Sequence, residues 1–168
     1  MYRSICFISF LFIVLCTTQV HADSDLRPTR QLIEEGEYKE AERSLKKITK
    51  NEPSNVEAWV LLGDSYVGME KDKKAVRAYE QALQLDPKKE AACLGLGNAY
   101  HLMKNYSYAL EAYKKVIEFN PKHAEAHYRL GLTYDRMAML TQAFEEYNIL
   151  KTIDERLAQK LYQTILGK

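Results

Sequence analysis

Apolar and small residues return on one face of a helix in two successive segments near the middle of the chain. The first segment covers about residues 56–69, and its helical face carries Trp59, Leu62, Gly63 and Tyr66. The polar run "GMEKDKK", which begins at Gly68, predicts a turn. A second helix is predicted over residues 72–85, with an inner side formed by Ala75, Ala78, Tyr79, Ala82 and Leu83. This helix ends before Pro87, because proline disfavours helical angles in the residue that precedes it.

This pair of helices recurs with a period of 34 residues. The phrases "LGDSY", "LGNAY" and "LGLTY" begin at Leu62, Leu96 and Leu130. Three further sets keep the same spacing, namely Pro53, Pro87 and Pro121, then Ala41, Ala75, Ala109 and Ala143, then Tyr79, Tyr113 and Tyr147. Several residue types that share one period indicate a repeat protein built of stacked helix pairs.

The repeated glycine is expected to mark a close contact between the two helices of a pair. Gly63, Gly97 and Gly131 lie in the middle of predicted helices, where glycine costs about 1 kcal/mol relative to alanine. The cost is acceptable if the missing side chain lets the partner helix approach. We expect the approaching residue to be the repeated alanine, namely Ala75, Ala109 or Ala143.

The repeated pattern resembles the tetratricopeptide repeat (TPR) family, with W-x2-LG-x2-Y followed by A-x3-[FY] and a closing proline. The second unit matches at Trp59, Leu62, Gly63, Tyr66, Ala75, Tyr79, Ala82 and Pro87, and the third and fourth units follow it. The first unit is complete only in its second half, because its opening helix lacks the glycine and tyrosine and is interrupted by Pro28. The resemblance implies an all-α solenoid of about 3.5 to 4 tandem helix-turn-helix units.

A last amphipathic helix is expected to seal the stack, with Leu157, Leu161 and Ile165 on one stripe. The chain then divides into a signal peptide (1–22), an incomplete first unit (23–55), three units (56–89, 90–123 and 124–155) and a C-terminal capping helix (156–168).

In proteins that resemble this one, the first helix of each unit lines the concave side of a superhelix. A stripe of mixed apolar and polar residues beside the packing stripe is therefore expected to form a partner-binding groove. It comprises Val60, Asp64, Val67, Leu94, Asn98, His101, Tyr128, Leu132 and Asp135. Such a surface suits an extended peptide or a partner helix. The alternative is that some of these residues, Val60 and Leu94 in particular, pack within the stack.

One partner class of the family is disfavoured. Members that hold acidic chaperone tails resemble one another in a clamp of lysines, asparagines and an arginine. The aligned positions here carry Val60, Asp64, Gly95, Glu125 and Arg129. Only Arg129 fits, and the acids at Asp64, Glu125 and Asp135 indicate a ligand with some basic character.

The first 22 residues have the plan of a secretory signal peptide. Arg3 precedes an apolar run from Ile5 to Cys16, and "VHA" ends at Ala22. We expect cleavage there and a periplasmic or secreted protein. A membrane location follows only if the segment is retained as an anchor or lipidated at Cys16, where Leu15 departs from the small residue that lipidation prefers.

The charge balance and the cysteine content disfavour a nucleic-acid partner and an intramolecular disulfide. The chain has 24 Lys+Arg and 23 Asp+Glu, and cleavage removes only Arg3, which leaves 23 of each. Such a balance predicts no nucleic-acid partner. Cys93 would be the only remaining cysteine, so no intramolecular disulfide is expected, and it reads as a small buried hydrophobe.

The candidates for chemistry have structural explanations. His123 and His127 are four residues apart, but Ala124 stands where the zinc-protease pattern H-E-x-x-H requires glutamate. We interpret them as a loop histidine and a core-edge histidine. No metal, cofactor, small-molecule substrate or enzymatic activity is expected.

The leading hypothesis is a non-enzymatic adaptor that binds a protein partner in the concave groove and helps assemble an envelope or secreted complex. The alternative is a structural homo-oligomer whose copies stack through their ends, and the incomplete first unit keeps this alternative open.

Overall fold

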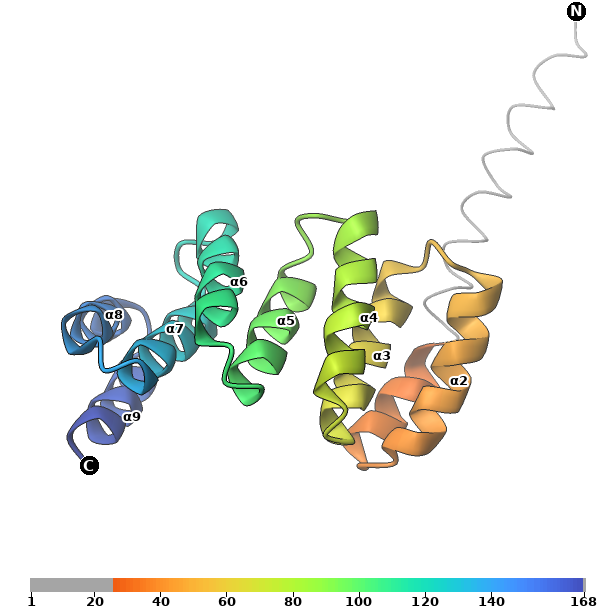
Figure 1. The fold of residues 1–168 in the computed structure, drawn as a ribbon, viewed down its shortest axis with the longest axis horizontal. Helices are drawn as coiled ribbons and strands as arrows, with labels where there is room; N and C mark the ends of the chain where they lie inside the picture. Colours follow the sequence, from red (N-terminus) through yellow and green to blue (C-terminus); the bar gives the residue numbers. More distant parts are fainter. Residues whose placement is uncertain (1–25, 168) are drawn as a thin grey trace, which may run out of the picture.

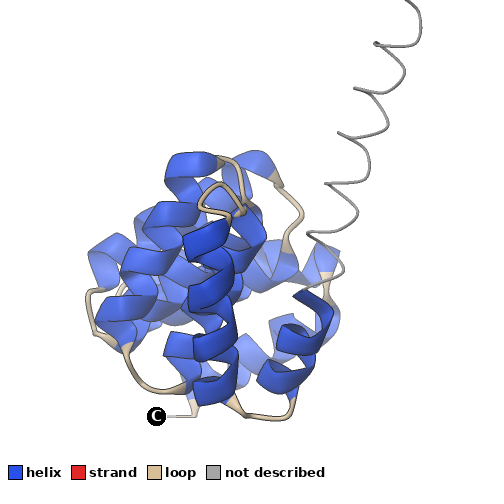
Figure 2. Cartoon of the chain, turned by 90° about the vertical axis from the view of Figure 1, so that its right-hand side faces the viewer, coloured by secondary structure: helices blue, strands red, loops and turns tan. Residues whose placement is uncertain are grey.

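The computed structural model describes residues 26–167, and every regular element in that range is a helix (Figures 1 and 2). The expected signal peptide lies outside the described residues. After a helical stretch over residues 26–34, the elements are α2 (Tyr38–Asn51), α3 (Val56–Gly68), α4 (Asp72–Leu85), α5 (Glu90–Leu102), α6 (Tyr106–Phe119), α7 (Ala124–Arg136), α8 (Leu140–Ile153) and α9 (Glu155–Leu166). None of the helices in this range has the length and apolar content that a membrane crossing requires.

Helices that follow one another in the chain pack as pairs, and the pairs stack along the long axis of the molecule (Figure 1). Helix α3 packs on α4, α5 on α6 and α7 on α8, while α5 also contacts the preceding α4 and α7 the preceding α6. The predicted all-α solenoid is confirmed. Pro28 was expected to interrupt the opening helix of the first unit. This expectation was wrong, because residues 26–34, which include Pro28, are helical.

The turns inside the pairs obey the repeat more strictly than the sequence suggested. Glu70, Lys104 and Ala138 are spaced by 34 residues and adopt positive φ angles of 57°, 60° and 58°. Gly36, one period earlier, has a φ of 81°. The turn therefore requires a left-handed backbone conformation at this position, and glycine adopts that conformation most readily. Gly68, which was expected to make the turn, is the last residue of α3.

The repeated glycines do mark close helix contacts, but the prediction of their partner was wrong. A Cβ atom on Gly63 would collide with the ring of Tyr79, and one on Gly97 with the ring of Tyr113. Tyr79 is also in contact with Gly95 of the next pair, so its ring lies between two glycines of different units. Tyr79 and Tyr113 are 1% and 0% exposed. The ring of Tyr79 holds α3, α4 and α5 together, and the ring of Tyr113 packs α6 against α5.

The fourth unit ends differently, because α9 takes over part of this packing. A Cβ on Gly131 would meet Leu161 of α9 instead of the tyrosine of its own pair. Leu157, Leu161 and Ile165 are all buried, as the predicted stripe requires. Helix α9 thus covers the apolar end of the stack that α7 and α8 would otherwise expose.

Candidate functional site

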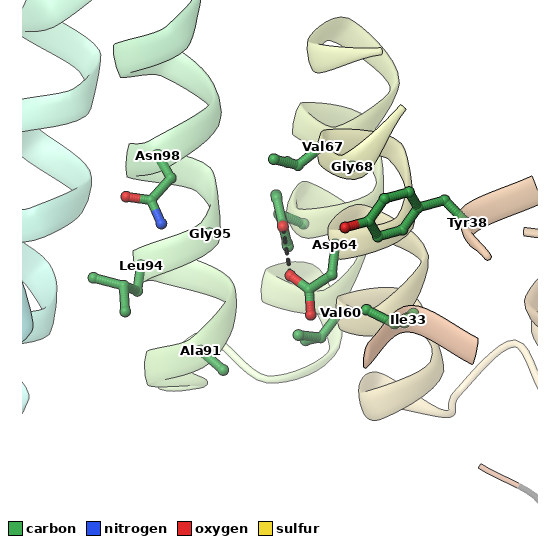
Figure 3. A pocket seen from close by; sticks show the side chains of 11 residues that line it. Ile33, Tyr38, Val60, Asp64, Val67, Gly68, Ala91, Leu94, Gly95 and Asn98 are labelled. Carbon is green, nitrogen blue, oxygen red and sulfur yellow. Dashed lines mark hydrogen bonds between the residues drawn. The ribbon is translucent and has the colours of Figure 1, made fainter. Parts of the chain in front are cut away.

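An open pocket of about 420 Å³ lies on one side of the stack between α3 and α5. Helix α3 contributes Val60, Asp64 and Val67, and α5 contributes Leu94 and Asn98 (Figure 3). The remaining lining residues are Ile33, Tyr38, Gly68, Tyr79, Ala91 and Gly95. The wall is mainly apolar, and Asp64 is the one charged side chain in it.

Hydrogen bonds from the buried tyrosines Tyr79 and Tyr113 fix Asp64 and Asn98 in the pocket. The Tyr79 hydroxyl donates to Asp64 Oδ1 at 2.7 Å, drawn as the dashed line in Figure 3. One period later, the Tyr113 hydroxyl donates to Asn98 Oδ1 at 2.8 Å. Each tyrosine therefore packs against a glycine with its ring and orients a pocket residue with its hydroxyl group.

The Asp64 carboxyl group is in an unfavourable setting for a charge. Burial raises its pKa, and the nearby charge of Glu57 raises the pKa further, whereas the Tyr79 hydrogen bond and the charge of Arg30 lower it. Burial also raises the pKa of the Tyr79 hydroxyl, which therefore remains a neutral donor. A ligand that brings a hydrogen-bond donor or a positive charge to such a carboxylate stabilises its ionised form.

Five of the nine predicted groove residues line this pocket together, namely Val60, Asp64, Val67, Leu94 and Asn98. Val60 is only 3% exposed and belongs to the hydrophobic core as well, which agrees with the alternative interpretation for that residue. The role of these residues in binding a partner stays a prediction.

The other four predicted residues do not line the pocket: His101 lies further along α5, and Tyr128, Leu132 and Asp135 belong to α7 of the fourth unit. Tyr128 is 6% exposed, and Lys160 of α9 places its Nζ atom 5.1 Å from the centre of the Tyr128 ring. Asp135 is 4% exposed and Leu132 is half-buried. His101 places its Nδ1 atom 2.9 Å from Thr133 Oγ1 and is occupied by that contact. The surface expected to run over three units is open mainly between the second and third.

Sequence reasoning missed pocket residues from the first unit. Ile33 and Tyr38 come from the part of the chain where the repeat signature is weakest. Gly95 was also missed, although a signal exists, since the equivalent positions carry the large residues Leu61 and Arg129. The glycine at this position lets the Tyr79 ring approach α5 closely.

Comparison with known proteins agrees with this architecture. Residues 26–160 match the family model described as the cytochrome c-type biogenesis protein H TPR domain. The chain belongs to this TPR family. No curated protein matches the chain.

Solved structures of TPR proteins superpose well on this one. A crystal structure of MamA has a TM-score of 0.71 and 25% identity, with 83% of this chain and 92% of that chain covered. A second crystal structure of MamA protein gives a TM-score of 0.73 at 25% identity, with 87% and 90% covered. A tetratricopeptide repeat protein from Parabacteroides merdae ATCC 43184 gives 0.72 at 23% identity and shares the fold, with 87% and 60% covered.

His123 and His127 of this TPR protein serve capping and packing. His123 Nδ1 accepts a hydrogen bond from the Ala126 backbone at 3.1 Å and caps α7. His127 takes the place of Trp59, whose indole Nε1 donates to the Pro53 carbonyl at 2.9 Å; His127 Nε2 lies 3.0 Å from the equivalent carbonyl of Pro121. Residues 26–167 hold no group of three side chains suited to a metal ion.

Proposed function

We propose that this TPR protein is a non-enzymatic adaptor that holds a helix or an extended segment of a partner protein in the pocket between α3 and α5. The observation that carries the proposal is the pocket itself, with apolar walls and two polar side chains held in place from behind by Tyr79 and Tyr113. Concave surfaces of stacked repeats are the usual binding surfaces of such proteins.

We also propose that the protein is exported and takes part in assembling a protein complex. The N-terminal residues have the plan of a signal peptide, which supports export to the periplasm or beyond. The matched family is described by cytochrome c-type biogenesis, a process of assembly. Both features support a role in assembling an envelope or secreted complex.

A crosslinked pull-down with two leucine-to-glutamate variants tests the adaptor role. Leu94→Glu places a charge in the pocket, whereas Leu85→Glu places the same charge at the exposed end of α4, where the leucine is 44% exposed. After circular dichroism has shown equal helix content, Leu94→Glu should lose the partner and Leu85→Glu should keep it. If both variants still recover the partner, binding in this pocket is refuted.

Self-assembly of copies through the ends of the stack is a second candidate function. Exposed apolar residues at the C-terminal end support it. Tyr162 of α9 packs its ring 5.1 Å from that of Tyr147 and 6.3 Å from that of Phe144. Tyr162 is 37% exposed and the nearby Leu166 is 58% exposed, so this end offers apolar surface. Light scattering over a range of concentrations tests it, since a monomer at every concentration would remove this candidate.

A further inference from the structure

The pocket lining carries one charged side chain. Asp64 is the single carboxylic acid among the lining residues, and no lysine or arginine lines the pocket with it. Within the described part of the chain, Arg30 is the cation whose charge acts on Asp64. Arg30 is already engaged, because its Nη2 atom lies 2.8 Å from Glu57 Oε1. The one hydrogen bond that Asp64 accepts from the described residues therefore comes from a neutral hydroxyl group, and no cation among them contacts the carboxylate directly.

The geometry of the carboxylate limits what can satisfy it. Oδ1 accepts the Tyr79 hydrogen bond, and no bond from residues 26–167 to the second oxygen is found. In Figure 3 this second oxygen is turned away from the Tyr79 bond, on the side of Val60. One available oxygen suits a single-point donor, whereas the planar fork of a guanidinium group binds best to two.

The walls beside Asp64 suit an aliphatic stem. Val67 and Leu94 lie on opposite sides of the pocket, on α3 and α5, and Ile33 adds an apolar side chain from the first unit. Lysine buries its methylene groups along apolar surface while its ammonium group seeks a polar partner. A pocket of about 420 Å³ has room for such a side chain together with part of the backbone that carries it.

We propose that the partner segment inserts a lysine side chain into this pocket, with its ammonium group on the free oxygen of Asp64 and its stem between Val67 and Leu94. This inference rests on the proposed adaptor function and names the chemistry that the adaptor recognises. Asp64 is then the specificity-determining residue of the pocket, and Tyr79 is a positioning residue behind it.

The repeat itself supplies a conservative test variant. The position equivalent to Asp64 in the third unit is Asn98, which accepts the same tyrosine hydrogen bond at 2.8 Å. Asp64→Asn should therefore fold and keep the Tyr79 bond while it loses the negative charge. The variant separates recognition of charge from packing.

The experiment selects random displayed peptides against the full chain and against Asp64→Asn, and keeps those whose binding Leu94→Glu abolishes. The wild type should enrich lysine at one peptide position, and Asp64→Asn should not. Replacing that lysine by norleucine should weaken binding to the wild type by roughly tenfold to a hundredfold and to Asp64→Asn much less. Replacement by arginine should also weaken binding to the wild type.

The outcomes distinguish the two proposals. If peptides bind in a Leu94-dependent way but show no lysine preference, or keep it on Asp64→Asn, the lysine inference is overturned and the adaptor function stands. If selection yields only peptides that bind regardless of Leu94→Glu, the pocket is not a binding site and both proposals fail.

Discussion

Nδ1 of His127 lies 2.6 Å from Glu146 Oε2, and the two residues are only 4% and 9% exposed. The other ring nitrogen of His127 lies 3.0 Å from the Pro121 carbonyl oxygen. Because both of these oxygens are acceptors, the ring satisfies them fully only when both nitrogens carry a proton. The fourth unit therefore holds a buried histidine–glutamate pair, suited to a protonated imidazole, where the second unit holds Trp59.

This pair should make stability depend on pH in a defined direction. The Glu146 hydrogen bond raises the pKa of His127 and outweighs the opposing effect of burial. A raised folded-state pKa means that the stabilisation is fully present below the unfolded pKa of about 6.5 and is lost as pH rises through the folded pKa. Urea unfolding of wild type and His127→Gln should differ most at about pH 5.5 and least at about pH 9.

Glu146→Gln is the control for that experiment. It removes the charged acceptor, so it should lower the His127 pKa measured by NMR and cost about 1.5–3 kcal/mol at low pH. An unchanged His127 pKa in Glu146→Gln would show that the pair does not form in solution.

Gly63→Ala should destabilise the protein by about 1–3 kcal/mol, because the added methyl group would collide with the Tyr79 ring. The intrinsic helix preference alone predicts a gain of about 1 kcal/mol from the same change. Urea unfolding of the single variants and of Gly63→Ala with Tyr79→Leu forms a double-mutant cycle. The cost of Gly63→Ala should shrink or reverse in the Tyr79→Leu background, and an additive cycle would contradict the proposed contact.

Two leucines of α9 test its capping role. Leu161 is 0% exposed against Gly131, whereas Leu166 is 58% exposed in the same helix. Leu161→Ala should cost about 2–5 kcal/mol of unfolding free energy, with Leu166→Ala within about 0.5 kcal/mol of wild type. Equal effects of the two changes in urea unfolding would show that α9 does not seal the stack.

Burial raises the pKa of the Cys93 thiol, and the side chain is 0% exposed. The thiolate is the reactive form, so Cys93 should react with iodoacetamide far more slowly in the folded protein than in urea. Mass spectrometry of the Cys93 peptide measures this separately from Cys6 and Cys16. Equal rates in both states would contradict the buried position.

The sequence predicted the repeat, the solenoid and the ends of α3 and α4 within about one residue, because helical periodicity and the repeat spacing are local signals. It did not predict that Tyr79 is the residue that meets Gly63, because the period fixes which positions are equivalent without fixing which side chains of the facing helix approach them. The long ring reaches across where the alanine at Ala75 was expected.

The candidate site was predicted in part for a related reason. Val60, Asp64, Val67, Leu94 and Asn98 share a pocket because they repeat the same face of α3 and α5. Tyr128 lies outside this pocket and is covered by Lys160 of α9. The sequence predicted this last helix as a cap, but the repeat does not encode which residues of the fourth unit it covers. Ile33 and Tyr38 were missed because their unit lacks half of the signature.

The central claim is that the pocket between α3 and α5 holds a partner. Photo-crosslinking in the cells that make the protein tests it most directly, with benzoylphenylalanine placed either at Val67 in the pocket or at Leu85 at the end of α4. The account predicts one discrete crosslinked protein from position 67 and none of the same mass from position 85. The same product from both positions, or from position 85 alone, would contradict it.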